Sequence, residues 1–174
     1  EFRLWAPAES SLTLEIDGHQ VAMARQDEGW FAVRLDHQPV GALYCYVLSD
    51  GTRVPDPASR FQPLGVGGPS WLCASDGFVW KQPGWLGRSW EEAIFYELHV
   101  GTFTREGTYA AAIEQLPRLA EIGFTAIELM PVAQFPGRWG WGYDGVFHFA
   151  PHNAYGTPDD LRRLVDAAHG CGLM

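Results

Sequence analysis

The first half of the chain alternates apolar and polar residues in short runs. Residues 2–7 and 12–16 follow this alternation with a period of two, which predicts strands that each bury one face. Asp17-Gly18 is a hairpin-turn signal, because both residues tolerate a positive φ. Further runs predict strands at residues 21–23, 30–35 and 43–48. Short strands with turns every eight to twelve residues or so predict a β-sandwich over residues 1–54.

Residues 55–92 have no clear period and are rich in Pro and Gly. A connection of this length without its own secondary structure is normally either disordered or ordered for a reason. This one carries large apolar rings that could hold it against its neighbours: Phe61, Trp71, Phe78, Trp80, Trp85 and Trp90. We therefore predict an ordered connector between two domains.

From residue 93 onwards, strands alternate with helices. Residues 94–100 and 125–130 read as strands, and a helix is expected between them from Tyr109 to Ile122. Thr108 should cap that helix, because its hydroxyl can accept a hydrogen bond from a free backbone N–H of the first turn. Pro117 should kink it, since Pro removes one backbone donor and clashes with the preceding turn.

A second helix is predicted to start at residues 157–160. Thr157 is the N-cap, Pro158 suits the first turn, and two Asp residues then meet the positive end of the helix dipole. The apolar face of this helix continues to Gly170, and Leu173-Met174 reads as the start of a third strand.

This order of elements predicts a parallel sheet with right-handed crossovers. Two architectures fit it: an open doubly wound sheet and the opening of a TIM barrel. No Gly-rich phosphate loop follows either strand, which weakens the nucleotide-binding version. Because a barrel needs about 250 residues, residues 93–174 would be only its opening, and we expect the chain to be a fragment that ends as the third strand begins.

Charge and composition narrow the partners of the protein. The chain of 174 residues has 12 Lys and Arg against 21 Asp and Glu, a formal charge of −9. Without a basic cluster, this balance argues against nucleic acid and against an anionic membrane. No apolar run approaches the roughly 20 residues that a membrane-spanning helix needs. The chain opens without Met, inside an apparent strand, which leaves a removed or missing leader open.

The cysteines and aromatic residues indicate the compartment and the ligand class. The chain has three cysteines, Cys45, Cys73 and Cys171. Their odd number does not suit a disulfide framework and their spacing fits no metal site, so they indicate a reducing cytoplasm. No set of His, Asp and Glu has metal spacing either, so we expect neither a metal nor another cofactor. Eight Trp, six Tyr and ten Phe occur beside 20 Gly, many of them in loop-like segments. Rings presented on loops can stack on sugars, although most such rings only fill cores.

The long loop expected over residues 132–156 is the first candidate site. It leaves the carboxyl end of the second strand, where parallel sheets bind ligands. Glycines flank Trp141 and Tyr143 and free the backbone to present the rings outward, and Asp144 can accept hydrogen bonds from sugar hydroxyls. Residue types alone support a structural and a functional role equally, and the unusual length of the loop favours function.

Three polar residues on the predicted strands are further candidates. His99 lies near the carboxyl end of the first strand, so it is expected to border the site. Glu97 and Glu128 are interpreted as paired polar groups in the filling of a barrel rather than as catalytic acids. Ser and Cys residues lack the context of a nucleophile elbow.

Four motifs resemble the alpha-amylase superfamily of glycoside hydrolases, and most closely its branching-enzyme and trehalohydrolase groups. They lie at residues 96–104, 128–132, 141–146 and 150–156. Residues 55–63 and 65–70 of the connector favour the trehalohydrolase group. The amino-terminal sandwich is then similar to the family 48 type of carbohydrate-binding module that precedes such barrels.

The resemblance implies a retaining hydrolase that cuts the α-1,4 bond next to the trehalose unit of malto-oligosyltrehalose. Retention needs two carboxyl groups about 5–5.5 Å apart. In the superfamily these groups come from later barrel strands, so we expect no catalytic residue in this chain and no activity of the chain alone. Tyr143 matches the ring that stacks on the sugar at the cleaved bond, Asp144 is the next candidate, and Trp141 follows from position.

Two alternatives stay open at this stage. A glucan branching enzyme, which is a transferase, would share the same sandwich and the same barrel opening. A non-catalytic protein that binds starch or glycogen through the sandwich would also explain the aromatic residues.

Overall fold

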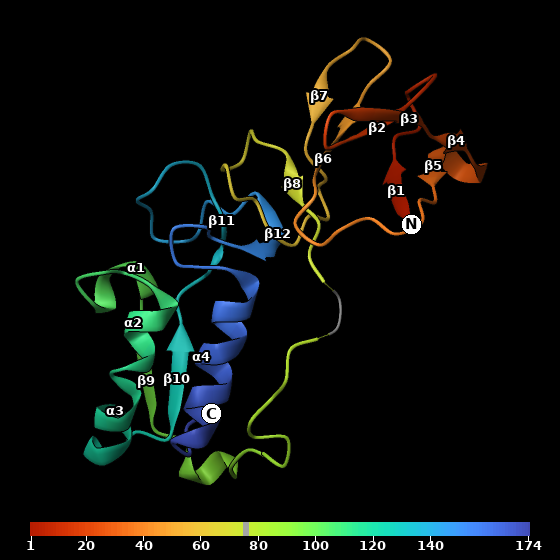
Figure 1. The fold of residues 1–174 in the computed structure, drawn as a ribbon. Coiled ribbons are helices and arrows are strands. Elements are labelled where there is room, and N and C mark those ends of the chain that lie inside the picture. Colours follow the sequence, from red (N-terminus) through yellow and green to blue (C-terminus); the bar gives the residue numbers. More distant parts are fainter. Residues whose placement is uncertain (75–76) are drawn as a thin grey trace.

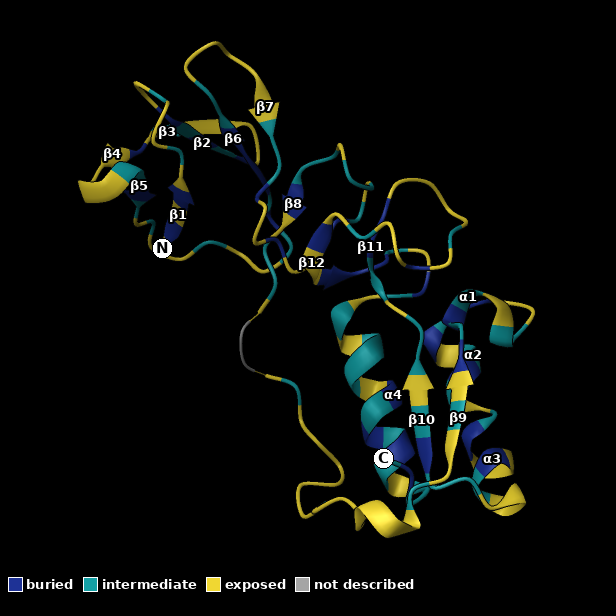
Figure 2. Cartoon of the chain, turned by 180° about the vertical axis from the view of Figure 1, so that it is seen from behind, coloured by how far each residue is buried: buried dark blue, intermediate teal, exposed yellow. Residues whose placement is uncertain are grey.

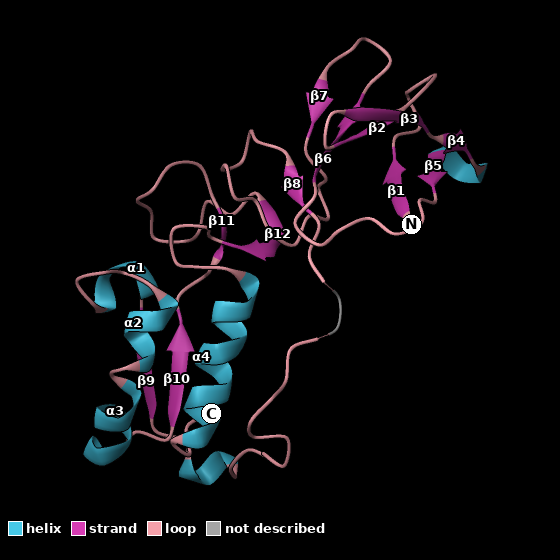
Figure 3. Cartoon of the chain, in the orientation of Figure 1, coloured by secondary structure: helices cyan, strands magenta, loops and turns pink. Residues whose placement is uncertain are grey.

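A computed structural model describes residues 1–74 and 77–174. The amino-terminal part is built mainly from strands, and the carboxy-terminal part combines strands with helices (Figure 1; Figure 3). The strands of the first part are β1 Phe2–Trp5, β2 Thr13–Ile16, β3 His19–Ala22, β4 Ala24–Arg25, β5 Trp30–Val33, β6 Leu43–Val47, β7 Arg53–Val54 and β8 Ser70–Trp71. A single 3-10 turn, Asp27–Gly29, precedes β5.

The first part is built from two antiparallel sheets that share one core. One sheet has the order β1-β5-β4, and the other has the order β3-β2-β6-β7 with β8 also paired to β6. Leu4 and Phe31 from the first sheet lie in the same buried cluster as Leu14 and Tyr46 from the second. Two sheets packed face to face on one core form a sandwich, which is what the period-two alternation predicts.

The predicted connector divides into two pieces. Ser70 and Trp71 hydrogen-bond to β6, so this part of the connector belongs to the second sheet. The Ser70 hydroxyl also accepts a hydrogen bond from the Gln62 side chain at 3.0 Å, in a buried position. Residues 77–92 instead run along the second part of the molecule and end in a 3-10 turn, Trp90–Glu92.

Asp166, on the long helix of the second part, holds the segment of residues 77–92 in place. Its nearly buried carboxylate accepts hydrogen bonds of 3.0 Å from the backbone N–H groups of Lys81 and Gln82. The Trp85 ring stacks on His169 with ring centres 4.9 Å apart, and Arg88 Nε donates to the Gly172 carbonyl at 2.7 Å. Residues 81–88 are therefore held against α4 and the turn that follows it by specific contacts.

Replacing Asp166 with Ala is expected to lower the free energy of unfolding by about 2–3 kcal/mol, because two backbone donors lose a charged acceptor. Asp159→Ala on the same helix is the matched control. Its exposed ion pair with Arg162 should contribute well under about 1 kcal/mol. Urea unfolding measures both variants, and amide hydrogen exchange at Lys81 and Gln82 should accelerate only in the Asp166 variant. Equal losses in the two variants would contradict this role.

The second part carries a pair of parallel strands covered by helices. Its elements are β9 Phe95–Leu98, α1 Val100–Phe103, α2 Tyr109–Ile113, α3 Leu116–Ile122, β10 Ala126–Leu129, β11 Ala133–Gln134, β12 Phe147–Pro151 and α4 Pro158–Gly170. β9 and β10 pair in parallel register, and α2 packs beside α4. Thr157 and Asp160 form the full capping box of α4, so its predicted start at residues 157–160 is confirmed.

Two local predictions need correction. Val100 was expected in the first strand, but the strand ends at Leu98 and Val100 opens the short helix α1, where its side chain is buried. The helix predicted over residues 109–122 is two helices, α2 and α3. Pro117 stands in the first turn of α3 rather than kinking a continuous helix, because its missing N–H has no helical partner there anyway.

The end of the chain pairs with β10. The Met174 N–H donates to the Thr125 carbonyl at 2.8 Å, and the Ile127 N–H donates to the Met174 carbonyl at 2.8 Å. One residue bonded to the two neighbours of a facing residue is the hydrogen-bond pattern of a parallel ladder. Met174 therefore pairs with β10 in the parallel sense.

The two faces of the β9–β10 pair differ. Tyr96, Leu98 and Ile127 pack into the core beneath the helices. Glu97 and Glu128 lie on the opposite face, pair in register, and are exposed. In Figure 2 no helix of residues 1–74 and 77–174 covers this second face.

Candidate functional site

The loop between β10 and α4 is anchored at its base by β11 and β12, which pair antiparallel. Between them the chain presents three large rings: Trp139 is 74 % exposed, Trp141 is 76 % exposed and Tyr143 is 68 % exposed. The intervening Gly140 and Gly142 face the protein instead. Glycine and ring alternate, so the backbone lies close to the protein while the rings face outward.

Gly142 is the tightest point of this loop. Its φ is +94°, and a Cβ built there would lie 2.0 Å from the Pro131 carbonyl oxygen. Pro131 lies two residues after the end of β10, so Gly142 lets the backbone that carries Tyr143 pack closely against the chain where it leaves that strand. Only a residue without a side chain fits this close approach.

His99 ties the loop to the end of β9. Its Nε2 lies 2.9 Å from the Gly140 carbonyl oxygen. A carbonyl only accepts hydrogen bonds, so Nε2 must carry the proton and donate. The Tyr155 hydroxyl lies 3.3 Å from the same nitrogen, and the Thr102 hydroxyl lies 3.4 Å from Nδ1. His99 is the N-cap of α1, directly after β9, and its nearest side-chain contact is the loop backbone at Gly140.

A hollow at the carboxyl end of β9 is lined by His99, Arg138, Trp139 and Tyr155, together with Arg105 and Glu106 after α1. The guanidinium of Arg138 lies 5.0 Å from the centre of the Trp139 ring, in cation–π contact.

The predicted site residues do not all meet in this hollow. Three predicted residues are exposed on the loop: Trp141, Tyr143 and Asp144. None of these three is among the described residues that line the hollow. Sequence reasoning missed Arg105, Glu106 and Arg138 as lining residues, because their proximity depends on α1 and on the path of the loop. Tyr155 could have been found, since it lies in the motif at residues 150–156.

His152 lies beneath the same loop and is fully buried. Its ring stacks on Phe135 with centres 3.8 Å apart and meets Tyr155 edge-on at 4.8 Å. Neither ring nitrogen has a hydrogen-bond partner among the described residues. Burial lowers the pKa of His152 below its ordinary value of 6.5, and the neighbouring His99 lowers this pKa too. The Arg138 backbone raises the pKa of His152, but burial is the larger effect.

This burial makes the fold sensitive to acid. Because the folded-state pKa is lower than the unfolded-state pKa, the unfolded chain binds more protons once the pH falls below about 6.5. The free energy of unfolding should therefore be greatest above that pH and fall on acidification. His152→Phe, which keeps an aromatic ring on Phe135, should flatten this dependence in urea titrations between about pH 7.5 and 5. His148→Gln, at an exposed position on β12, is the control and should keep the pH dependence of the unmodified protein. If the free energy of unfolding of His152→Phe fell with pH as steeply as that of the control, the assignment to His152 would be wrong.

Neither a metal centre nor a membrane-spanning helix is found among residues 1–74 and 77–174. No three His, Cys, Asp or Glu side chains come together there to hold a metal ion. No helix in that part is both long enough and apolar enough to cross a membrane.

No protein-family model matches the chain. Sequence comparison does find relatives along almost its whole length. The chain is 47 % identical to the malto-oligosyltrehalose trehalohydrolase of Saccharolobus solfataricus, covering 99 % of this chain and 31 % of that protein. It is 46 % identical to the trehalohydrolase of Deinococcus radiodurans, covering 99 % and 28 %. A 1,4-alpha-glucan branching enzyme of Vibrio parahaemolyticus is 33 % identical, with 99 % and 26 % covered.

Solved structures are similar over the same range. A protein of Salmonella typhimurium, assigned provisionally as an alpha amylase, superposes with a TM-score of 0.97 at 52 % identity, covering 99 % of this chain and 30 % of that one. A type I pullulanase of Bacillus subtilis superposes with a TM-score of 0.81 at 23 % identity, covering 99 % and 30 %, and at that identity the likeness concerns the fold alone.

The relatives of this chain by sequence and by structure are enzymes of the alpha-amylase family of glycoside hydrolases. Within that family its sequence relatives are the malto-oligosyltrehalose trehalohydrolases, and the branching enzyme is more distant. The chain spans about three tenths of the length of the curated relatives that it matches.

Proposed function

We propose that the protein carrying this chain hydrolyses the α-1,4 bond next to the trehalose unit of malto-oligosyltrehalose and releases trehalose. The observation that carries this proposal is the 47 % identity to a trehalohydrolase over 99 % of the chain. Hydrolysis with retention requires a nucleophile and an acid about 5–5.5 Å apart, and we expect both to lie outside these 174 residues.

The proposed architecture is a β-sandwich of the carbohydrate-binding type over residues 1–54, an ordered connector over 55–92 and the opening of a (β/α)8 barrel over 93–174. The bare face of β9 and β10 supports the barrel, because barrel strands turn one face to a shared interior. The parallel hydrogen bonds of Met174 support a third strand. The pairing of β8 with β6 adds residues 70–71 to the sandwich.

Within the proposed site, Tyr143 stacks on the sugar ring at the cleaved bond. Asp144 accepts hydrogen bonds from sugar hydroxyls, and Trp141 extends the ring surface along the loop. His99 lines the adjoining hollow and holds the loop through Gly140. The exposure of the rings and the close backbone contact of Gly142 support these roles, because a flat ring on a fixed backbone can orient a sugar without first being ordered.

The test is a product assay on maltotriosyltrehalose with the protein as encoded by its gene. Trehalose and maltotriose should appear in equal amounts. The 174-residue chain alone should release neither. New α-1,6 branches in amylose without trehalose release would establish the branching-enzyme alternative instead. Glucan binding without any turnover would establish a non-catalytic binding protein.

The cytoplasmic location is also part of the proposal. It rests on the cysteine usage, since Cys45, Cys73 and Cys171 are free thiols. Malto-oligosaccharide is the proposed partner, and neither nucleic acid nor membrane is expected.

A further inference from the structure

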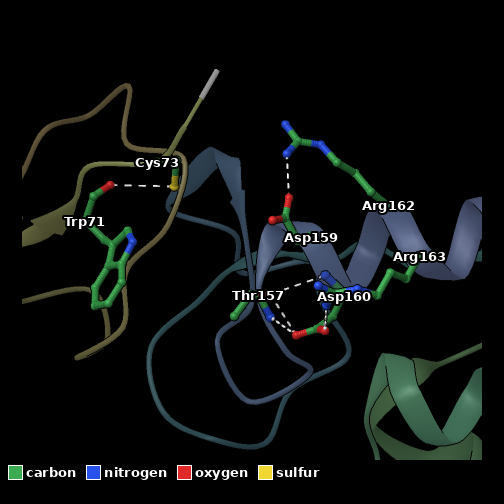
Figure 4. Close-up of polar contacts among 7 residues, drawn as sticks. All are labelled: Trp71, Cys73, Thr157, Asp159, Asp160, Arg162 and Arg163. Carbon is green, nitrogen blue, oxygen red and sulfur yellow. Dashed lines mark hydrogen bonds and ion pairs between the residues drawn. The ribbon is translucent and has the colours of Figure 1, made fainter. Parts of the chain in front are cut away.

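We propose a second binding site for α-glucan chains in the cleft between the β-sandwich and the start of α4. The sandwich side of this cleft includes Phe61 and Trp71, and the α4 side includes Pro158, Asp159 and Arg162. Figure 4 shows Trp71 on one side and Asp159 and Arg162 on the other. It encloses a cavity of about 240 Å³. The choice of glucan as the ligand rests on the proposed function; the place of the site does not.

The sandwich wall offers a fixed aromatic ring. Trp71 is 37 % exposed, and its ring packs edge-on against Phe61 with centres 6.2 Å apart. Gly41 supports the ring from another side, because a Cβ at that position would lie 3.1 Å from the Trp71 ring. A ring held in this way presents a flat apolar face to a ligand, and little conformational freedom is lost on binding.

The opposite wall offers polar groups without a strong net charge. The Arg162 guanidinium pairs with the Asp159 carboxylate at 2.6 Å. The pair neutralises itself, and its remaining lone pairs and N–H groups can bond hydroxyls. The positive end of α4 is also occupied, because Asp160 closes the capping box with Thr157 and pairs with Arg163. This wall therefore suits a neutral ligand with many hydroxyl groups better than an anion.

A neighbouring hollow lengthens the cleft. It shares Pro158 and Arg162 with the first cavity and adds Arg60 and the ring of Phe149, which is 68 % exposed. Two hollows in series, each with an exposed ring, fit a linear chain of sugars better than a compact molecule.

This cleft is separate from the loop site. It shares no lining residue with the hollow at His99 in the described part of the chain. The two sides come from segments about ninety residues apart in sequence, and Asn153 Nδ2 joins them by donating to the Pro63 carbonyl at 3.0 Å. A glucan held here would stay bound while its end is processed elsewhere.

The decisive experiment is hydroxyl-radical footprinting of the gene-encoded protein with and without maltoheptaose, read by mass spectrometry. Trp71 and Phe149 should be oxidised at least threefold more slowly in the presence of the sugar. Trp90, which is 76 % exposed and does not line the cleft, is the internal control and should be unaffected. Unchanged oxidation of both Trp71 and Phe149 at saturating maltoheptaose would overturn the proposal.

Variants add a second readout, the retardation of the protein in native gels that contain glycogen. Trp71→Ala should weaken retention at least fivefold, and Trp90→Ala should not change it. If Trp71→Ala lowers the melting temperature, Phe149→Ala replaces it, because an exposed ring can be removed without disturbing a core. Full retention in Phe149→Ala and in a folded Trp71→Ala would refute the site.

Two outcomes separate this inference from the proposed function and from another ligand class. A protein that releases no trehalose, yet loses glycogen retention in Trp71→Ala, would end the proposed function and leave the cleft standing. Protection of Trp71 by inorganic phosphate but not by maltoheptaose would show an anion site and overturn the inference.

Discussion

Gly142→Ala is expected to lower the free energy of unfolding by about 3 kcal/mol or more and to reduce trehalose release at least about tenfold. A residue with a side chain at a φ of +94° loses about 1–2 kcal/mol. The new Cβ would also meet the Pro131 carbonyl at 2.0 Å, so the backbone must move, which costs about another 1–3 kcal/mol. A displaced loop misplaces Tyr143, and catalysis is sensitive to shifts of about 1 Å.

Gly137→Ala is the matched control for this prediction. Gly137 lies in the same loop with a φ of +82°, but nothing stands within 4 Å of the Cβ that Ala would add. It should therefore show only the backbone cost of about 1–2 kcal/mol and retain most of its turnover. Urea unfolding and steady-state kinetics on maltotriosyltrehalose compare the two variants. Equal effects would mean that the contact with Pro131 does not position the loop.

The elements that could be predicted from the sequence are those with a strong local cause. The alternation at residues 12–16 reappears as β2, whose Leu14 and Ile16 are buried. The start of α4 was predictable, because the cap, the first-turn Pro and the acidic residues all act within one turn of helix. The parallel pairing of β9 with β10 follows from the helical crossover between them.

What could not be predicted depends on contacts distant in sequence. β8 is a two-residue strand without alternation, and only its pairing with β6 makes it part of a sheet. His152 looks like an ordinary loop histidine, and its burial arises from the stacking on Phe135. The hollow at His99 needs the turn α1 to bring Arg105 and Glu106 beside the loop. The sequence therefore indicated the aromatic residues Trp141 and Tyr143 of the candidate site. The charged residues that line the neighbouring hollow could be identified only from the fold.

Tyr143→Ala is expected to reduce kcat/KM for trehalose release about a hundredfold while leaving stability almost unchanged. The side chain is 68 % exposed, so its removal should change the free energy of unfolding by no more than about 0.5 kcal/mol. The proposed role is to orient the sugar ring at the cleaved bond, and loss of orientation at the reacting centre can cost about two orders of magnitude.

Three companion measurements decide whether orientation by the ring is the cause. Tyr143→Phe keeps the ring and should recover most of the activity, since stacking needs the aromatic face rather than the hydroxyl. Val146→Ala, at a 51 % exposed position of the same loop, should behave like the unmodified protein. If Tyr143→Ala raised KM alone and left kcat intact, the ring would bind substrate and transition state equally. In that case Tyr143 would bind the glucan without orienting the bond that breaks. Residues outside this loop would then have to orient that bond.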